Sequence, residues 1–385
     1  MKILILTHPL KINYGGLLQA YALQYYLRNL GHDVCTNTRL DYNPLKYRII
    51  SLLKRIIKFF IGEISFKEII PFSPTKEQQT YIAQHTWRFV QENMKTIDFF
   101  EGKHFPSSEK IEQFDMYIVG SDQVWRPTAP NIKTYFFDFL EKYPSKKRIS
   151  YAASFGVAKW NRGKAITFEC AKLLQEFDKV LVREDSAIQI CEKNFNVKAL
   201  QVLDPTMLLS QDHYVSLVNA DKSVKSYQGN LMIYILDKTT LKVDFIRKIS
   251  NKLGMDVFDV FDVEKLTKHN ILKIDKCIVP PVTQWLRGFM DAKFIITDSF
   301  HGVVFSIIFN KPFIALNNPR RGTPRFNSIL NTFELKERFI DLSQTIDNLD
   351  EIFEKINFYE LDNIEIIYKK EKIKTINLLN SIFIK

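Results

Sequence analysis

The sequence predicts an α/β protein with two domains, each built around a parallel sheet. With 385 residues, the chain is longer than one ordinary hydrophobic core accommodates, which favours two domains. Short apolar runs alternate with segments of helical spacing, which is typical of βαβ units. The alternation begins again after Pro205, so the same pattern occurs twice along the chain.

The first half of the chain contains short apolar segments that predict strands, and a loop or a helix follows each of them. These strands are expected at residues 2–7, 34–38, 116–120, 149–154, 179–183 and 199–203. Gly15 and Gly16 begin the helix that follows the first strand. We therefore expect a first Rossmann-like domain over residues 1–210.

The second half repeats this order and adds a final amphipathic helix. Strands are expected at residues 231–236, 256–261, 294–297 and 313–316, and helices at 242–253 and 364–382. The second Rossmann-like domain then covers residues 211–385 and includes the final helix, with the domain boundary between 205 and 225. Two such domains that face one cleft form a GT-B-like fold, in which ligands bind beyond the carboxyl ends of the strands.

Composition and charge exclude several classes of protein. The four cysteines form no CxxC pair, which argues against a zinc site and against a disulfide framework. The N-terminus MKILILTHP reads as a strand rather than a signal peptide, and no apolar run reaches the ~18 residues of a membrane span, so we expect a cytoplasmic protein. The net charge of +11 attracts nucleic acid, anionic lipid or phosphorylated small molecules. No nucleic-acid-binding motif accompanies this charge, so no nucleic-acid partner is expected.

The run from Asp298 to Gly302 is the strongest candidate for chemistry. It follows a predicted strand and opens a buried helix that continues through Ile308. Either Asp298 or Ser299 suits the N-cap, which puts His301 in the first turn, at the predicted cleft. Free N–H groups and the positive end of the helix dipole make such a turn an anion site, where an imidazole binds phosphate or delivers a proton. The alternative is a capped helix with a structural histidine.

Arginines follow two other predicted strands. Arg320, Arg321 and Arg325 lie in the loop after the strand at 313–316. Guanidinium groups match carboxylate and phosphate, so this cluster indicates an anionic ligand unless the loop is simply a solvated basic one. Arg183 ends a strand, where a cation either points into the cleft or pairs with one of the acidic residues that follow it.

Two polar turns complete the predicted cleft. Asp122 follows the strand at 116–120 and is a candidate base, a ligand for sugar hydroxyls or a turn cap. Trp125 is either a platform for a sugar or a buried aromatic. The run Asn13-Tyr14-Gly15-Gly16 joins the first strand to the first helix, and its glycines permit close approach of a ligand. It is not GxGxxG, and the chain has no GxxxxGK[ST] run, so neither a dinucleotide site nor a P-loop is predicted.

The segment at residues 46–61 is basic and amphipathic. Basic residues alternate there with isoleucine, leucine and phenylalanine at helical spacing. Such a helix can lie on an anionic membrane, although a core-packing helix with a solvated basic face has the same pattern.

Taken together, these runs resemble the polysaccharide pyruvyl transferase family. The resemblance lies in six motifs that occur in the family's order: NYGGLLQA at 13–20, VGSDQVW at 119–125, SYAASFG at 150–156, VREDS at 182–186, LDPT at 203–206 and TDSFHG at 297–302. No single motif is decisive, but the ordered set is specific. It implies a GT-B-like fold, phosphoenolpyruvate as the donor, and a hexose acceptor in a cell-surface polysaccharide or its lipid-linked precursor. The product would be a pyruvate ketal on two hydroxyls, formed with release of phosphate and without a metal or a cofactor.

The resemblance also implies roles for single residues. It matches the family's phosphoenolpyruvate-binding histidine to His301, the expected catalytic residue with Asp122 as a weaker candidate, and its strand-end arginine to Arg183. Some members carry an arginine two residues before the histidine, where this chain has Ser299, so another cation must take its place, and Arg325, Arg320 and Lys311 are the candidates. The expected donor site is Arg183, Ser299, Phe300, His301, Lys311, Arg320 and Arg325, and the expected acceptor site is Asn13, Tyr14, Gly15, Gly16, Asp122 and Trp125.

Two other functions stay open at this point. A GT-B glycosyltransferase that uses a nucleotide sugar would share the fold and a basic cleft. A non-catalytic sugar-binding protein of polysaccharide assembly is the third reading, and the presence of His301 and Arg183 counts against it. A lipid-linked acceptor would give residues 46–61 a reason to lie at the inner face of the cell membrane.

Overall fold

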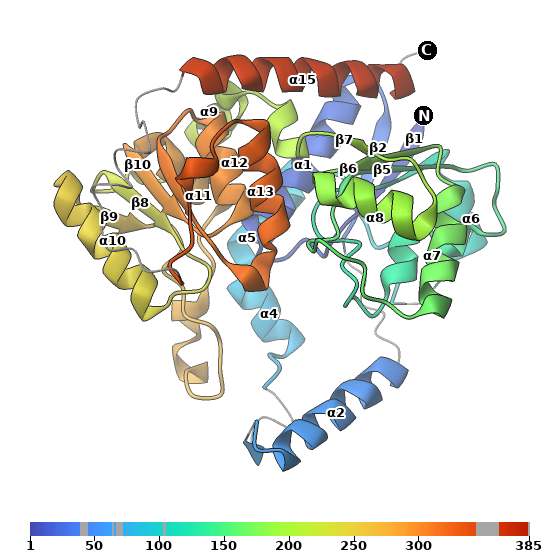
Figure 1. Ribbon diagram of the computed structural model, residues 1–385, viewed down its shortest axis with the longest axis horizontal. Coiled ribbons are helices and arrows are strands. Elements are labelled where there is room, and N and C mark those ends of the chain that lie inside the picture. Colours follow the sequence, from blue (N-terminus) through green and yellow to red (C-terminus); the bar gives the residue numbers. More distant parts are fainter. Residues whose placement is uncertain (39–44, 64, 67–71, 103–104, 344–361, 384–385) are drawn as a thin grey trace.

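The computed structural model describes residues 1–38, 45–63, 65–66, 72–102, 105–343 and 362–383. Its strands form two parallel sheets (Figure 1). The first sheet contains β1 (Lys2–Leu6), β2 (Asp33–Asn37), β3 (Thr96–Ile97), β4 (Met116–Val119), β5 (Lys147–Ala153), β6 (Lys179–Val182) and β7 (Leu200–Gln201). The second contains β8 (Leu231–Tyr234), β9 (Val257–Asp259), β10 (Phe294–Thr297), β11 (Phe313–Leu316) and β12 (Phe339–Ile340).

Both sheets are doubly wound. The strand order is β3-β2-β1-β4-β5-β6-β7 in the first sheet and β12-β11-β10-β8-β9 in the second. The α-helices are α1 (Tyr14–Asn29), α2 (Leu45–Phe60), α4 (Lys76–Ile82), α5 (Gln84–Asn93), α6 (Ser108–Glu112), α7 (Lys164–Gln175), α8 (Asp185–Phe195), α9 (Gln211–Ala220), α10 (Thr240–Leu253), α11 (Val282–Asp291), α12 (Phe300–Ile308), α13 (Thr323–Thr332) and α15 (Asp362–Phe383). Short 3₁₀ helices are η1 (Ile132–Phe136), η2 (Asp138–Leu140), η3 (Pro205–Leu208), η4 (Ile271–Cys277), η5 (Pro319–Arg321) and η6 (Lys336–Arg338).

Helices cover both faces of each sheet because the strands are apolar on both sides. On one face of the first sheet, Leu4 and Val119 belong to a core cluster that includes Leu173 of α7 and Ile190 of α8. On its other face the cluster includes α1 and α15, through Ile3, Ile5, Leu23, Leu27, Leu379 and Phe383. The second sheet packs on α10 on one face and on α11, α12 and α13 on the other.

The predicted fold class is confirmed: the chain is α/β, with two parallel sheets in a GT-B-like arrangement and a C-terminal helix. The edge strands β3 and β12 were not predicted, because no apolar run or alternation marks either of them in the sequence. Within the described residues, no helix combines the length and the apolar character that crossing a bilayer requires.

The C-terminal helix α15 returns from the second sheet to the first, and Figure 1 shows it lying across one end of the molecule. Ile364, near its start, shares a core cluster with the second sheet. Leu379 and Phe383, near its end, pack with the first sheet. The helix therefore connects both sheets, although the sequence analysis assigns it to the second domain alone. The domain limits of 1–210 and 211–385 stay a prediction.

Candidate functional site

A cleft of about 740 Å³ lies between the carboxyl ends of the two sheets. The loops after β1 and β4 contribute Asn13 and Asp122, and the first turn of α12, which follows β10, contributes His301. The segment after β11 contributes Arg321 and Arg325. One wall is apolar and consists of residues in and before α4 and around η4, including Phe72, Pro74, Ile82, Phe261, Val263, Leu266 and Val279. The cleft thus lies where parallel α/β sheets bind their ligands.

His301 lies in the first turn of α12 and lines the cleft, with only 5% of its surface exposed. The helix begins there because Ser299 is its N-cap, whose Oγ accepts a hydrogen bond from the N–H of Gly302. The imidazole lies directly against the first turn of α1, since a Cβ on Gly15 would come within 2.0 Å of Nδ1. Glycine at position 15 therefore lets α1 and α12, from different sheets, meet at the histidine.

Three helices begin at this cleft. Asn13 precedes α1, Ser299 precedes α12, and Arg325 lies in the first turn of α13. The first N–H groups of a helix have no partner within the helix and carry the positive end of its dipole. Their convergence favours an anionic ligand in the cleft.

Arg183 lies buried beside the cleft and organises the loops around it. Its Nη1 donates to Asp204 Oδ2 at 3.0 Å and to Ser121 Oγ at 3.2 Å, and its Nη2 lies 3.4 Å from Asp122 Oδ1. The guanidinium also covers the ring of Phe300, 4.3 Å from its centroid. Burial opposes its charge, but Asp122 and Asp204 outweigh burial and raise the pKa of Arg183. Three carboxylates, those of Asp122, Asp204 and Glu184, therefore already pair with the cation that the resemblance assigns to the donor.

Asp204 is the carboxylate that faces the histidine. Its Oδ2 lies 3.6 Å from Nε2 of His301, an ion-pair distance that is longer than a good hydrogen bond. Thr206 fixes the other oxygen through its N–H at 3.1 Å and its hydroxyl at 2.8 Å. Burial alone would raise the pKa of Asp204, but His301 and Arg183 together lower it below its usual value. Asp204 is thus a carboxylate at neutral pH and can fix the orientation of the imidazole.

Arg325 and Asp122 lie opposite each other in the cleft. Nη1 of Arg325 is 3.5 Å from Asp122 Oδ1, and its Nη2 donates to the carbonyl of Arg321. Burial, with the nearby charge of Arg183, lowers the pKa of Arg325 to about 10, so the group stays charged at neutral pH. Burial would raise the pKa of Asp122, but Arg183 and other cations lower it below its usual value. Asp122 also has a φ of 77°, a strained backbone conformation for a residue other than glycine.

Asp298 has a structural role in the second sheet. It is fully buried and accepts hydrogen bonds from Nζ of Lys242 at 2.6 Å and from Nδ2 of Asn318 at 2.8 Å. Nearer the surface, Nε of Arg321 donates to Asp237 at 2.9 Å, and this bond is the main cause that lowers the pKa of Asp237 to about 2. In the described part of the chain, no group of three His, Cys, Asp or Glu side chains is placed to hold a metal ion.

The structure brings together six of the side chains that the sequence analysis assigns to the site. These residues line the cleft: Asn13, Asp122, Ser299, Phe300, His301 and Arg325. Gly15 touches the histidine ring, and a Cβ on Gly16 would lie 3.1 Å from the side chain of Asn13.

Two expected acceptor residues do not reach the cleft. Trp125 has no exposed surface, stacks on Phe136 and donates its Nε1 hydrogen to the carbonyl of Tyr135. Tyr14 is also buried, and its hydroxyl donates to the carbonyl of Pro280. Both side chains belong to the packed interior, so neither presents a face to a sugar.

Two expected donor residues also lie elsewhere. Lys311 precedes β11, at the end of the sheet opposite the cleft, and its Nζ donates to the carbonyls of Met290 and Ala292. Arg320 is exposed on η5 and is not part of the cleft wall. Its neighbour Arg321 lines the cleft instead.

Asp204 was not identified from the sequence as a site residue, and Arg321 was predicted only as a member of the basic cluster, not of the donor site. Asp204 belongs to the LDPT motif, and an acidic residue directly after a strand was the signal that could have identified it. For the arginines, the sequence does not show which members of the run after β11 turn inward.

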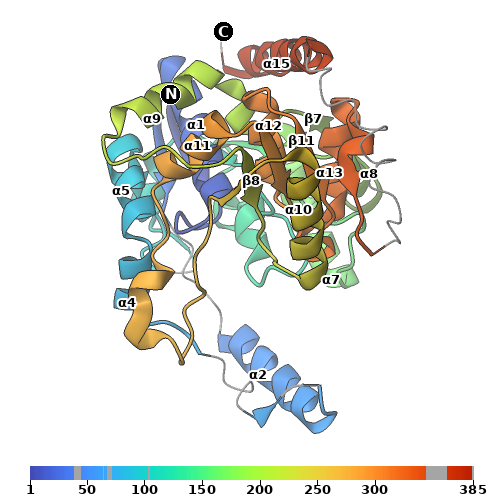
Figure 2. The same cartoon turned by 90° about the vertical axis from the view of Figure 1, so that its left-hand side faces the viewer.

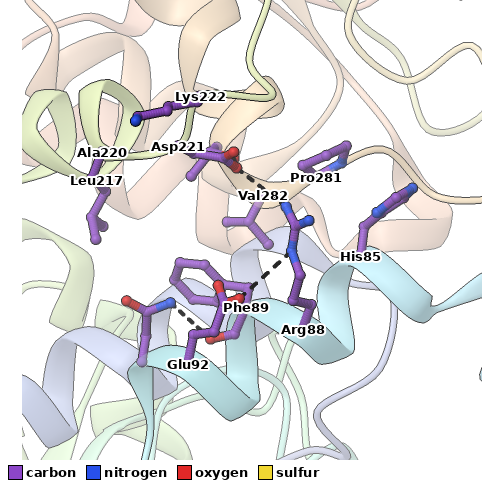
Figure 3. A pocket seen from close by; sticks show the side chains of 12 residues that line it. His85, Arg88, Phe89, Glu92, Leu217, Ala220, Asp221, Lys222, Pro281 and Val282 are labelled. Atoms are coloured by element: carbon purple, nitrogen blue, oxygen red, sulfur yellow. Dashed lines mark hydrogen bonds and ion pairs between the residues drawn. The ribbon is translucent and has the colours of Figure 1, made fainter.

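A second pocket, of about 380 Å³, lies between α5, α9 and α11 (Figure 3). Figure 3 shows Arg88 reaching toward Asp221 and Glu92, from which it is 3.4 Å and 3.9 Å away. Asp221 also accepts a hydrogen bond from Thr283 at 2.6 Å. The arginine of this pocket pairs with carboxylates of its own walls, as Arg325 does with Asp122, but the pocket has only about half the volume of the cleft at His301. We therefore take the cleft as the candidate functional site.

The chain resembles, at the level of fold, UDP-GlcNAc 2-epimerase from Methanocaldococcus jannaschii (12% identity, 99% of this chain and 100% of that chain, TM-score 0.49) and UGT89C1 from Arabidopsis thaliana (9% identity, 99% of each chain, TM-score 0.47). No curated protein sequence matches it. The family model of polysaccharide pyruvyl transferase matches residues 13–320, which is most of the 385-residue chain. The chain therefore belongs to the polysaccharide pyruvyl transferase family and is a transferase.

Proposed function

We propose that this protein transfers a pyruvyl group from phosphoenolpyruvate to two hydroxyls of a hexose in a cell-surface polysaccharide or its precursor. One observation carries the proposal: His301 lies at the amino end of α12, against the amino end of α1, with the carboxylate of Asp204 behind it. A cation of the chain, Arg325, shares the cleft. The donor carries a phosphate and a carboxylate, and this combination of helix ends, imidazole and guanidinium suits both.

The donor phosphate fits best between the amino ends of α1 and α12, next to the imidazole. Its carboxylate then needs a second cation, because Ser299 stands where some family members have an arginine. Of the three replacements that the sequence offers, Arg325 lines the cleft, whereas Lys311 and Arg320 lie away from it. We therefore assign the carboxylate to Arg325, with Arg321 closer to the surface.

In the proposed reaction, protonated His301 donates a proton to the methylene carbon C3 of the donor, which makes C2 electrophilic. A first sugar hydroxyl adds to C2 and gives its proton to the imidazole. The bond between C2 and the phosphate oxygen then breaks, and inorganic phosphate leaves. The second hydroxyl adds to the same carbon and releases its proton to solvent, which closes the ketal. Asp204 stays ionised throughout and holds the ring in position.

Asp122 is better suited to binding the acceptor than to removing a proton. Its pKa is lowered, which makes it a weak base but a good hydrogen-bond acceptor for a sugar hydroxyl. Nδ2 of Asn13 lies 3.5 Å from it and can donate to a second oxygen of the same sugar.

Titration calorimetry of the purified chain with phosphoenolpyruvate and with nucleotide sugars tests the proposal. We expect saturable binding of phosphoenolpyruvate and phosphate release when a galactose- or mannose-containing acceptor is added. His301→Ala should abolish phosphate release, whereas His269→Ala, at an exposed histidine, should leave it unchanged. Binding of a nucleotide sugar without any binding of phosphoenolpyruvate up to millimolar concentration would favour a glycosyltransferase and overturn the proposal. Failure to bind either class of ligand would indicate a non-catalytic protein.

A further inference from the structure

The helix α2 stands apart from the rest of the protein. In Figures 1 and 2 it projects beyond α4, away from both sheets. Its apolar side chains are correspondingly exposed, up to 79% for Phe60. Exposed apolar residues on one helix are unusual, because a soluble protein normally buries such a face.

The exposed residues of α2 separate into two faces. Of the twelve residues from 49 to 60, eight are apolar and three are basic. Projected at 3.6 residues per turn, the apolar ones fill one half of the helix and the basic ones the other. We define the α2 apolar face as these eight apolar residues, of which Ile49, Ile50, Leu52, Leu53, Ile57 and Phe60 are exposed, and the α2 basic face as Lys54, Arg55 and Lys58. Residues 45–60 include no acidic residue.

In the sequence, this helix precedes residues of the cleft wall. Phe72 and Pro74 follow α2 by 12 and 14 positions in the sequence, and together with Ile82 of α4 they form part of the apolar wall of the cleft. The segment η4 lies beside α4, joined to it by a 2.6 Å hydrogen bond from Tyr81 to Asp275. Both views show η4, in pale orange, on the side of the molecule from which α2 projects, and its Leu272 is 97% exposed.

We propose that α2 binds the surface of an anionic lipid bilayer and holds the mouth of the cleft toward it. A helix that lies in the membrane interface buries its apolar half among the acyl chains and leaves its basic residues at the anionic headgroups. With 16 residues, α2 is shorter than the ~20 that a spanning helix needs. It can therefore bury the α2 apolar face only by lying parallel to the bilayer surface. One consequence rests on the proposed function: the acceptor sugar is then presented to the cleft on a lipid in this bilayer.

The apolar face of α2 matches a membrane better than a second copy of the chain. Pairing of two helices uses a narrow stripe of apolar residues, whereas the apolar face of α2 is half of the circumference wide. The whole chain carries a net charge of +11, so two copies repel each other while an anionic surface attracts each of them.

Co-sedimentation of the full chain with vesicles tests this proposal. We expect binding to vesicles of phosphatidylcholine with phosphatidylglycerol, weak binding to phosphatidylcholine alone, and weaker binding as salt is raised. Lys54→Gln with Lys58→Gln should reduce the partition coefficient by roughly fivefold per lysine. Leu53→Ser, Ile57→Ser and Phe60→Ser together should reduce it by at least roughly 30-fold.

Matched substitutions on α10 serve as controls. Lys248→Gln with Lys252→Gln removes two exposed lysines at the same spacing, and Leu241→Ser with Val243→Ser removes two exposed apolar side chains. Neither pair should change vesicle binding by more than twofold.

Three results would overturn the proposal: no binding of the unmodified chain to anionic vesicles, equal binding of the α2 and α10 variants, or a change from dimer to monomer on substitution of the apolar face without any effect on vesicles. Phosphate release with a water-soluble acceptor should be the same in every variant. A protein that binds vesicles but shows no phosphate release would thus contradict the proposed function and leave the role of α2 standing.

Discussion

Replacement of Gly15 by alanine tests whether the reaction needs the imidazole where the structure places it. The new Cβ would lie 2.0 Å from Nδ1 of His301, 2.2 Å from Cγ and 2.6 Å from Cε1. An ordinary contact needs about 3.4 Å, so the ring and the backbone of α1 must separate by roughly 1.4 Å. Misplacement of a catalytic group by ~1 Å can cost roughly 100-fold in rate, and we expect at least this loss in kcat.

The same substitution should have only a small effect on stability. Overpacking costs about 1–3 kcal/mol, and the higher helix propensity of alanine returns about 1 kcal/mol of it. Steady-state phosphate release together with thermal unfolding therefore separates the two effects. The expected result is a large fall in kcat with a shift of only a few degrees in Tm.

Two further glycines provide a graded control. An alanine at Gly163, before α7, would meet nothing within 4 Å and should have wild-type activity. An alanine at Gly16 would lie 3.1 Å from Asn13 and should have an intermediate effect. A Gly15→Ala enzyme with wild-type kcat and an unchanged Tm would refute the assignment of His301 as the proton donor in this position.

Three other substitutions have expected outcomes. Asp204→Asn should lower kcat about 100-fold and change the KM for phosphoenolpyruvate little, because it removes the charge that orients His301. A pH–rate profile identical to that of the wild type would contradict this role of Asp204. Lys242→Met leaves the buried carboxylate of Asp298 without its cation and should lower the free energy of unfolding, measured with denaturant, by about 3–5 kcal/mol. A loss below about 1 kcal/mol would mean that Asn318 and backbone N–H groups are enough to stabilise the carboxylate. Asp237→Asn should remove a stabilisation that is complete above pH ~4, the usual carboxyl pKa, and that disappears as the pH falls through about 2, the pKa of Asp237 in the folded protein. The partly exposed pair limits this difference to roughly 1–2 kcal/mol, and a difference that grows on acidification would contradict its sign.

The sequence predicts the sheets well because strand formation here depends on local pattern. The buried strand Phe294–Thr297 is bounded as expected, and the other long strands lie within a few residues of their predicted limits. The two-residue strands β3 and β12 depend on pairing with a neighbour that is distant in sequence, through contacts such as Thr36 with Thr96 and Ala315 with Phe339. No local pattern encodes such a partner.

The sequence predicts a residue of the candidate site only where that residue directly follows the end of a predicted strand. His301 is found from sequence because a capped helix after a buried strand fixes its location. Which way a side chain points depends on packing, so Trp125 and Lys311 could not be placed in advance. The pairing of Arg183 with Asp204 joins residues 21 positions apart, and only the folded chain shows that this arginine is already engaged.

The return of α15 to the first sheet affects how the protein folds. Leu379 and Phe383 cover apolar side chains of β1, a strand that lies far from α15 in the sequence. The first sheet can form from neighbouring βαβ units, but Ile3 and Ile5 keep an incompletely covered apolar face until α15 packs on them. Truncation of the final turn of α15 would leave that face open, so folding of the first sheet is completed only by a contact that is distant in sequence.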